Sequence, residues 1–162
     1  MLIQFKRLAL KIWKWLPLPP RCRWNIAWML RQKFRVAVAA VILDEEGRLL
    51  LCEHSYRGYY PWGIPGGDLK VGEKPEDGVR REVQEETGFE VDVVRPLVLY
   101  NASEYPHVSL IFHCRILSGA FRQNLEISSI RFFHETDLPE RILPSERGII
   151  THALRLLRSE SE

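Results

Sequence analysis

The sequence predicts an α/β fold, an α/β/α sandwich in which helices cover both faces of a sheet. Five segments rich in β-branched and aromatic residues are bounded by turn-forming clusters, one helical segment lies mid-chain, and a second lies near the end. Strands that are interrupted by one helix and followed by another are typical of layered α/β domains. With 162 residues, 46% of them hydrophobic, the chain is long enough for one good core.

The first two strand segments cover residues 35–43 and 48–53. Asp44-Glu45-Glu46-Gly47 between them is a turn-forming cluster, so we expect these strands to form a hairpin. Three further strand segments follow the mid-chain helix, at residues 90–100, 107–117 and about 127–134.

The mid-chain helix is predicted from its end signals. Pro75 suits the first helical turn, where an N–H would have no partner, and Gly88 suits the C-terminal cap. Val79 and Val83 stand four residues apart and form an apolar stripe for the core. Gly78 costs the helix about 1 kcal/mol relative to alanine, so we expect close packing to require it.

The last helix is predicted to begin at Ser145, a good N-cap residue, and to end near Arg158. Its apolar residues recur at the spacing that buries one helix face. They are Ile150, Ala153, Leu154 and Leu157.

A cluster of acidic residues lies on the mid-chain helix. Glu82, Glu85 and Glu86 are spaced i, i+3 and i+4, so their side chains fall on one helix face. Such close carboxylates raise one another's pKa unless a cation neutralises them. Mg²⁺ and Mn²⁺ prefer oxygen ligands, which they often share with phosphates. Isolated acidic runs are usually solvated surface, but the helix signals around this one favour a metal site.

The acidic helix belongs to a longer pattern that resembles the Nudix box, G-x5-E-x7-R-E-U-x-E-E-x-G-U, where U is a bulky apolar residue. Every fixed position matches in Gly67-x5-Glu73-x7-Arg81-Glu82-Val83-x-Glu85-Glu86-x-Gly88-Phe89. The segment Trp62-Gly63-Ile64-Pro65-Gly66-Gly67 also resembles the stretch that usually leads into the box. Phe89, in place of an aliphatic residue, is a mild departure.

The resemblance implies a Nudix-like sandwich with a mixed β-sheet, and hydrolysis of a nucleoside diphosphate linked to a moiety X. A diphosphate resists hydrolysis because its negative oxygens repel a nucleophile, so charge must be neutralised and a water activated. Mg²⁺, or Mn²⁺, is the implied cofactor. Its implied ligands are Glu82, Glu85, Glu86 and the backbone carbonyl of Gly67, where the missing Cβ permits close approach.

The resemblance also implies a glutamate as general base and an arginine that orients a glutamate. Glu82 is the first candidate for the base. Glu126 is the second, because some Nudix enzymes place an extra ligand or base in a downstream loop at about this point. An ordinary residue at a strand edge is the equal alternative for it. Arg81 is expected to orient Glu73, its usual partner in the family. A structural ion pair between these two residues is the alternative.

Substrate contacts are predicted just before the glycine loop. Arg57 suits phosphate oxygens, and Tyr59 and Trp62 suit stacking on a base, although packing in the core or anchoring a loop is the more common use of an aromatic ring. Tyr105-Pro106 lies about sixteen residues beyond the box. Relatives with proline there act on ADP-ribose and those with tyrosine on dinucleoside polyphosphates, so the pair does not decide between them.

Two substrate classes are disfavoured by motifs that the sequence lacks. The extended motif of the coenzyme A hydrolases and the SQPWPFPxS array of the NADH hydrolases are both missing. Nucleotide sugars, ADP-ribose-like compounds, dinucleotides and nucleoside triphosphates stay open. A module that keeps the fold and senses a nucleotide without turnover is the alternative to an enzyme, and the intact carboxylates argue against it.

The N-terminal part differs from the rest in charge. The first 35 residues hold nine lysines and arginines, and no acidic residue occurs before Asp44. The remainder holds fourteen basic and twenty-one acidic residues, a formal charge of −7, so the overall +2 conceals two opposed parts. We therefore divide the chain into a basic, helical extension, residues 1–34, and a Nudix hydrolase domain, residues 35–162.

The extension is predicted to begin with an amphipathic helix that Pro17 ends. Its apolar face consists of Leu2, Phe5, Leu8, Ala9, Ile12, Trp13 and Leu16. A basic amphipathic helix suits peripheral contact with an anionic membrane. Alternatively, the apolar face covers the domain or a partner subunit in a homodimer.

Neither nucleic-acid binding nor membrane insertion is favoured for the extension. No recognisable nucleic-acid-binding fold accompanies its basic residues. No apolar run approaches the roughly 20 residues of a membrane span, and charges interrupt any secretory signal. We therefore expect a cytoplasmic protein.

Overall fold

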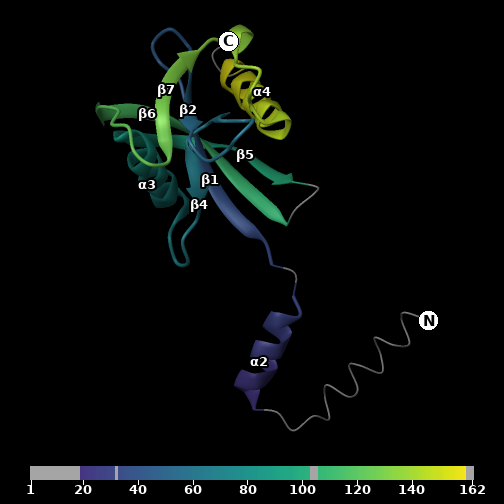
Figure 1. The fold of residues 1–162 in the computed structure, drawn as a ribbon. Coiled ribbons are helices and arrows are strands. Elements are labelled where there is room, and N and C mark those ends of the chain that lie inside the picture. Colours follow the sequence, from purple (N-terminus) through teal and green to yellow (C-terminus); the bar gives the residue numbers. More distant parts are fainter. Residues whose placement is uncertain (1–18, 32, 103–105, 160–162) are drawn as a thin grey trace, which may run out of the picture. The chain divides into compact units, whose positions relative to one another are not determined.

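The computed structural model describes residues 19–31, 33–102 and 106–159. The chain forms two compact units, Met1–Lys33 and Phe34–Glu162. Figure 1 shows the strands gathered in the second unit.

The described part of the first unit contains helix α2 (Pro20–Met29). Trp24 and Trp28 are exposed, and Lys33 Nζ lies 3.8 Å from the centroid of the Trp28 ring, a cation–π contact. The amphipathic helix predicted before Pro17 lies outside the described residues, so membrane contact and a homodimer stay predictions. No helix within the described ranges is long and apolar enough to cross a membrane.

Two sheets make up the centre of the second unit. The larger has the order β4-β1-β6-β5, with bounds Gly66–Asp68, Arg35–Ile42, His107–Gly119 and Phe89–Ala102. It is mixed, because β1 runs parallel to β6 while the β1–β4 and β5–β6 pairs are antiparallel. The smaller is antiparallel and has the order β3-β2-β7, with bounds Trp62–Gly63, Leu49–His54 and Ile127–Phe133.

The hairpin predicted for the first two strands is wrong. Its turn forms, since the Gly47 N–H donates to the Asp44 carbonyl at 3.0 Å and Leu43 bridges Leu49. Beyond that bridge, β4 and β6 occupy the two hydrogen-bonding edges of β1, so β2 pairs with β3 and β7 instead. The turn therefore carries the chain from one sheet to the other.

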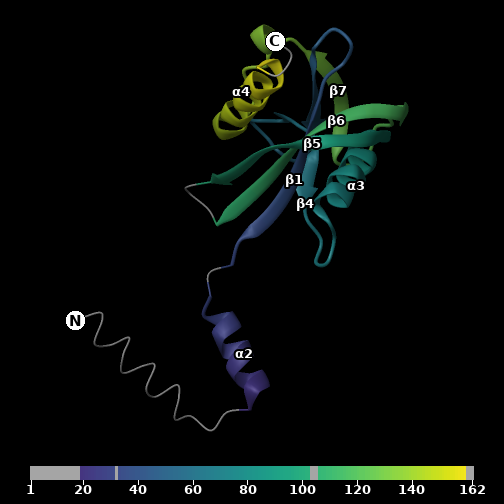
Figure 2. The same cartoon turned by 180° about the vertical axis from the view of Figure 1, so that it is seen from behind.

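Two long helices cover opposite sides of the strands, α3 (Pro75–Thr87) and α4 (Pro144–Arg158), as Figure 1 and Figure 2 show from two sides. Alternate residues of β1 serve the two layers: Val38 and Ala40 pack with the α3 core, and Val41 packs with the α4 core. The predicted α/β/α sandwich with a mixed sheet is confirmed. A short 3-10 helix, Glu135–Asp137, follows β7.

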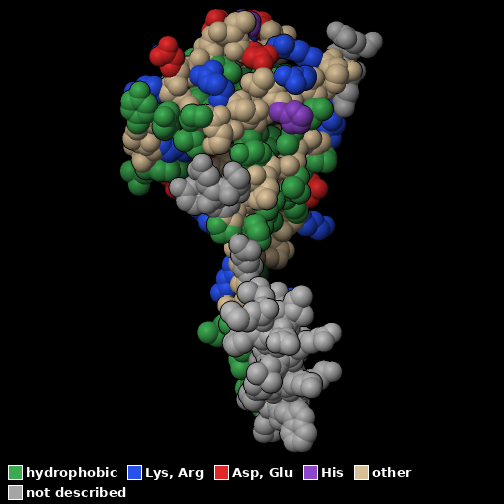
Figure 3. Space-filling view, turned by 90° about the vertical axis from the view of Figure 1, so that its right-hand side faces the viewer, with side chains coloured by type: hydrophobic (Ala, Val, Ile, Leu, Met, Phe, Trp, Pro, Cys, Tyr) green, Lys and Arg blue, Asp and Glu red, His purple; other side chains and the backbone are tan. Residues whose placement is uncertain are grey.

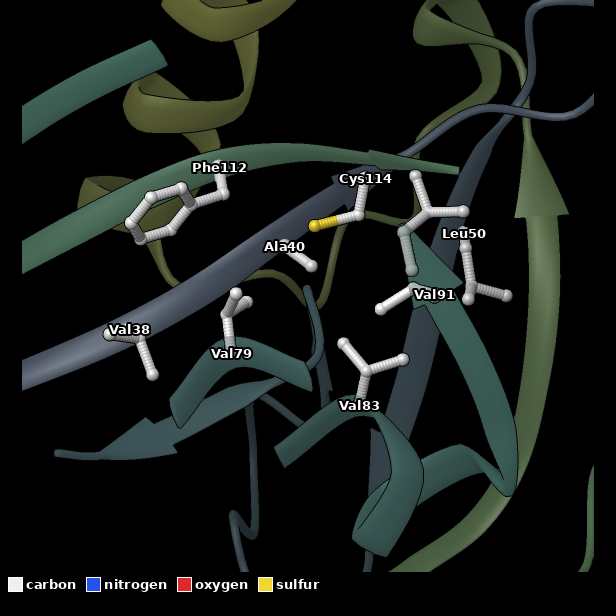
Figure 4. Close-up of a cluster of buried hydrophobic side chains, with 9 residues drawn as sticks. Val38, Ala40, Leu50, Val79, Val83, Val91, Phe112 and Cys114 are labelled. Atoms are coloured by element: carbon white, nitrogen blue, oxygen red, sulfur yellow. The ribbon is translucent and has the colours of Figure 1, made fainter. Parts of the chain in front are cut away.

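The apolar stripe of α3 packs as predicted. In Figure 4, Val79 and Val83 point toward Ala40, Phe112 and Cys114 of the strands above them. Gly78 is buried beside them, and an added Cβ would lie 2.7 Å from Leu69 Cδ1. Close packing therefore accounts for this glycine.

The predicted N-cap of the last helix, Ser145, is wrong. Pro144 begins α4, Leu143 is its N-cap residue, and no side chain caps the helix. Ser145 therefore lies inside the first turn, while Ile150, Ala153 and Leu154 are buried as the spacing predicts.

Charged side chains are unevenly spread over the surface. Figure 3 shows one face of the second unit, where hydrophobic side chains cover much of the middle and acidic and basic ones gather toward the top. The second unit therefore exposes apolar area as well as charge on this side, which is ordinary for a folded domain.

Two glycines provide a test of how α3 ends. Gly88, the C-cap residue, has φ 78°, and an added Cβ would lie 2.6 Å from the Ala120 carbonyl oxygen. Gly72 has φ 82° with nothing within 4 Å. We expect Gly72→Ala to lower the free energy of unfolding by about 1 kcal/mol, the left-handed strain alone, and Gly88→Ala by at least about 2 kcal/mol in urea denaturation. Equal losses would show that the contact with Ala120 does not constrain the cap.

Candidate active site

A cleft of about 870 Å³ opens on the second unit. The pairing of the strands sets the order of the residues along the cleft. Arg35 pairs with His107 at one end, and Ala39 pairs with Gly66 further along β1. Beyond Gly66, the lining continues through Ile64 to the first turn of α4. Glu82, Glu86 and Glu126 also line the cleft.

The glycines of β4 allow α3 to place its carboxylates at the cleft. An added Cβ on Gly67 would lie 2.5 Å from Glu82 Oε2, so any larger residue would displace that carboxylate. The Gly66 N–H donates to Glu86 Oε2 at 2.8 Å. The glycine pair thus fixes the edge of the sheet directly against two acidic side chains.

Glu86 is a buried carboxyl group with little compensation. Its residue is 3% exposed, and burial, with the nearby charges of Glu82 and Glu126, raises its pKa to about 8. His54 Nδ1 lies 3.8 Å from Glu86 Oε1. Burial and the charge of Arg57 lower the His54 pKa to about 3, so this histidine is neutral at pH 7 and does not balance Glu86. An added cation would favour the ionised form of Glu86.

Arg81 binds several acidic groups at once. Its Nε and Nη2 donate to the two oxygens of Glu73 at 2.8 and 2.9 Å. Its Nη1 donates to Glu82 at 2.6 Å and to Glu85 at 3.1 Å. The hydrogen bond from Arg81, together with the Lys70 N–H, lowers the Glu73 pKa to about 2. A bidentate pair therefore joins the loop before α3 to the helix itself.

The family model of the NUDIX domain matches residues 33–153. The chain belongs to the Nudix family. A MutT-like protein of Streptomyces ambofaciens is 37% identical over 122 residues, covering 75% of this chain and 74% of that protein. A putative ADP-ribose pyrophosphatase of Bacillus subtilis is 27% identical over 105 residues, which cover 58% of this chain and 50% of that protein.

Solved structures agree with this assignment. A UDP-X diphosphatase superposes with a TM-score of 0.69 at 26% identity, covering 85% of this chain and 71% of the other. An ADP-ribose pyrophosphatase of Streptococcus suis superposes with a TM-score of 0.67 at 29% identity, covering 80% and 95%. The prediction of a Nudix hydrolase is confirmed, and the fold and the Nudix box lie within the matched residues.

Three of the four predicted metal ligands lie at the cleft, and one does not. Glu82, Glu86 and Gly67 line the cleft, and so does Glu126, at the start of β7. Glu85 does not: its side chain is 57% exposed and pairs with Arg81 and, at 3.7 Å, with Lys70. The i, i+3, i+4 spacing puts three carboxylates on one helix face, but only two of them reach past the glycines of β4.

The predicted substrate contacts are also divided. Arg57 lines the cleft. Tyr59 does not; it is exposed and packs edge-on against Tyr60. Trp62 packs edge-on against Phe133, so it has the packing role that was the alternative to stacking on a base. Tyr105 lies outside the described residues.

Some cleft residues were missed by sequence reasoning. They are Arg35, Tyr56, Tyr100, His107, Ser109 and Glu146. Tyr56 precedes Arg57 in the sequence, so the position just before the glycine loop that indicated Arg57 could also have indicated Tyr56. The others come from strands and a helix far from the box in sequence, and they carry no motif that marks them.

The cleft residues fit a divalent cation in their chemistry. Carboxylates of Glu82, Glu86 and Glu126 with the Gly67 backbone supply the oxygen ligands that Mg²⁺ and Mn²⁺ prefer. As placed, no three acidic, histidine or cysteine side chains of the described residues form a ready ligand set. Glu82 is instead bound by Arg81.

The Arg81–Glu73 pair predicts a specific pH dependence of stability. Because folding lowers the Glu73 pKa to about 2 from 4.5, the carboxylate stabilises the fold above pH 4.5, and this contribution is lost as pH falls toward 2. We expect Glu73→Gln to melt below the wild type at pH 7, with the gap narrowing between pH 4.5 and 3. Glu76→Gln, an exposed change on the same helix, is the control. A gap that is equal at pH 7 and pH 3 would contradict the pair.

Proposed function

We propose that the protein hydrolyses the diphosphate linkage of a nucleoside diphosphate joined to a second moiety X, with Mg²⁺ as its metal. The observation that carries this proposal is the position of Glu82, Glu86 and Glu126. They line a cleft whose floor continues from Gly66 toward Arg35 on one side and toward α4 on the other.

The cleft has two arms, one that runs from Gly66 toward Arg35 and one that runs toward α4. These arms favour a substrate with a group on each side of its diphosphate. One arm offers Tyr100, His107 and Ser109 beside the small residue Ala37. Small floor residues leave room for a flat ring, and a tyrosine adds a stacking surface. The other arm is lined by Arg57, Ile149 and the first turn of α4. A nucleoside triphosphate would leave the second arm empty.

Each acidic residue has a proposed task. Glu82 and Glu86, with Glu126 and the Gly67 carbonyl, would hold the metal. A bound Mg²⁺ neutralises phosphate oxygens and lowers the pKa of water. Glu82 is the first candidate for the general base and Glu126 the second.

Arg81 has a positioning task in this proposal. Glu73 holds two of its nitrogens, so Nη1 meets Glu82 in one orientation. For a cation to share Glu82, that ion pair must loosen while the bond to Glu73 remains. Arg81 then stays close enough to direct the Glu82 carboxylate toward water.

ADP-ribose is the proposed first substrate to test. Of the similar proteins described above, one is named an ADP-ribose pyrophosphatase, one a putative ADP-ribose pyrophosphatase, and one a UDP-X diphosphatase. A panel of ADP-ribose, UDP-sugars, dinucleoside polyphosphates and nucleoside triphosphates, each with Mg²⁺ or Mn²⁺, measures the preference as kcat/KM. We expect the compounds with two groups on a diphosphate to exceed the triphosphates. Nucleotide binding without any turnover would support the sensing module instead.

Substitution of Glu82 tests the mechanism. Loss of a general base or metal ligand costs on the order of 10²- to 10⁴-fold in rate, so we expect Glu82→Gln to reduce kcat by this factor. Glu76→Gln, which alters an exposed residue on the first turn of the same helix, should stay within about twofold of the wild type. An unchanged rate in Glu82→Gln would remove Glu82 from the mechanism.

A further inference from the structure

Glu146 is a buried carboxylate that joins three separate segments. Its Oε2 accepts a hydrogen bond from Arg57 Nη1 at 3.0 Å, and its Oε1 accepts one from the Ile64 N–H at 2.9 Å. Arg57 follows β2, Ile64 lies between β3 and β4, and Glu146 belongs to the first turn of α4. Its side chain is 15% exposed. None of the box residues takes part in this junction.

The junction is packed too tightly for the pair to move freely. Gly63 is buried against it, and an added Cβ would lie 2.5 Å from Glu146 Oε1 and closer still to Arg57 Nη1. Glu146 also stands near the positive end of the α4 dipole, which favours a negative charge there. These constraints hold the arginine head group in one place.

Arg57 combines spare donors with a fixed position. Arg35, the other arginine in the cleft lining, also binds through one nitrogen, its Nη2, to both oxygens of Asp68, but its side chain is 71% exposed whereas that of Arg57 is 28% exposed. Arg57 uses Nη1 alone, and within the described chain its Nε and Nη2 donate to no group. The positive charge of Arg57 also acts on Glu86: it lowers the Glu86 pKa and so opposes the rise that burial causes. The arginine is therefore within electrostatic reach of the proposed metal ligands.

We propose that Glu146 is a positioning residue, which holds the Arg57 guanidinium at the cleft so that its remaining N–H groups meet the diphosphate oxygens of the substrate. This inference rests on the proposed function for the identity of the ligand. A long arginine side chain loses conformational freedom when it binds a phosphate, and Glu146 imposes that loss before the substrate arrives. The pair is thus preorganised.

A purely structural role for Glu146 is the competing explanation. Glu146→Gln separates the two, because glutamine keeps the shape and the acceptor for the Ile64 N–H but loses the charge that holds Arg57. Arg57→Gln breaks the same pair from the other side and leaves Glu146 in place. If Glu146 works through Arg57, the two substitutions must not add.

The experiment is a double-mutant cycle in steady-state kinetics with the best substrate of the panel. We expect Glu146→Gln and Arg57→Gln each to raise KM about tenfold, with kcat changed less than KM. The double variant should match Arg57→Gln alone. Glu135→Gln, which cuts the 2.7 Å ion pair to Arg158 at the other end of α4, is the matched control and should leave KM unchanged. A full additional effect of Glu146→Gln in the Arg57→Gln background would overturn the proposal.

A binding measurement keeps this test independent of turnover. The wild type, Glu146→Gln, Arg57→Gln and the double variant are titrated by calorimetry, with Mg²⁺, against an ADP-ribose analogue that carries a methylene group between its phosphorus atoms. We expect affinity to fall about tenfold in each single variant and no further in the double variant. Absence of hydrolysis with this pattern would refute the proposed function and keep the inference. Equal affinities in all four proteins, or no binding by the wild type, would refute the inference.

Discussion

The guanidinium of Arg81 is the group on which the arrangement of the box depends. It donates to Glu73, Glu82 and Glu85, and also to the Asp68 carbonyl at 3.2 Å. One cation thus joins the end of β4, the following loop and α3. Without it, the acidic face of α3 would repel Glu73 of the loop, and the cost would grow with burial. Arginine suits this task better than lysine, because its planar fork serves several oxygens at fixed angles.

Glu86, one turn beyond Glu82 on the same helix, has the opposite surroundings. Arg81 leaves it unpaired, and it is bound by a single Gly66 N–H beside a neutral His54. Taking a carboxylate out of water is costly unless positive charge compensates it. Glu82 lies between these two conditions, in contact with the arginine and near the buried acid. This gradient along one helix supports the proposal that a divalent cation binds on the cleft side of α3 and not beside Glu85.

Much of the box could be predicted because its determinants are local. Pro75, Gly88, Val79 and Val83 act within one helix, and the structure uses them as expected. The hairpin failed for a non-local reason, since β4 and β6 compete for the edges of β1 and no turn sequence reveals that competition. Trp62 was ambiguous because a ring that can stack on a base can equally pack against Phe133. Glu146 escaped notice because its partners, Ile64 and Arg57, lie 82 and 89 positions away in the sequence.

This division between local and distant determinants has a chemical reason. In the proposed reaction the bond to be broken is the same whatever the moiety X is, so its machinery can sit in one continuous loop and helix. Recognition of the groups on either side needs surfaces several ångströms apart, which only the sheet and α4 can supply. Arg57 belongs to both sets: its charge acts on Glu86, while its orientation is imposed by Glu146 from another layer of the sandwich. If Arg57 binds the diphosphate as proposed, a change in the first turn of α4 alters substrate affinity while the box stays intact.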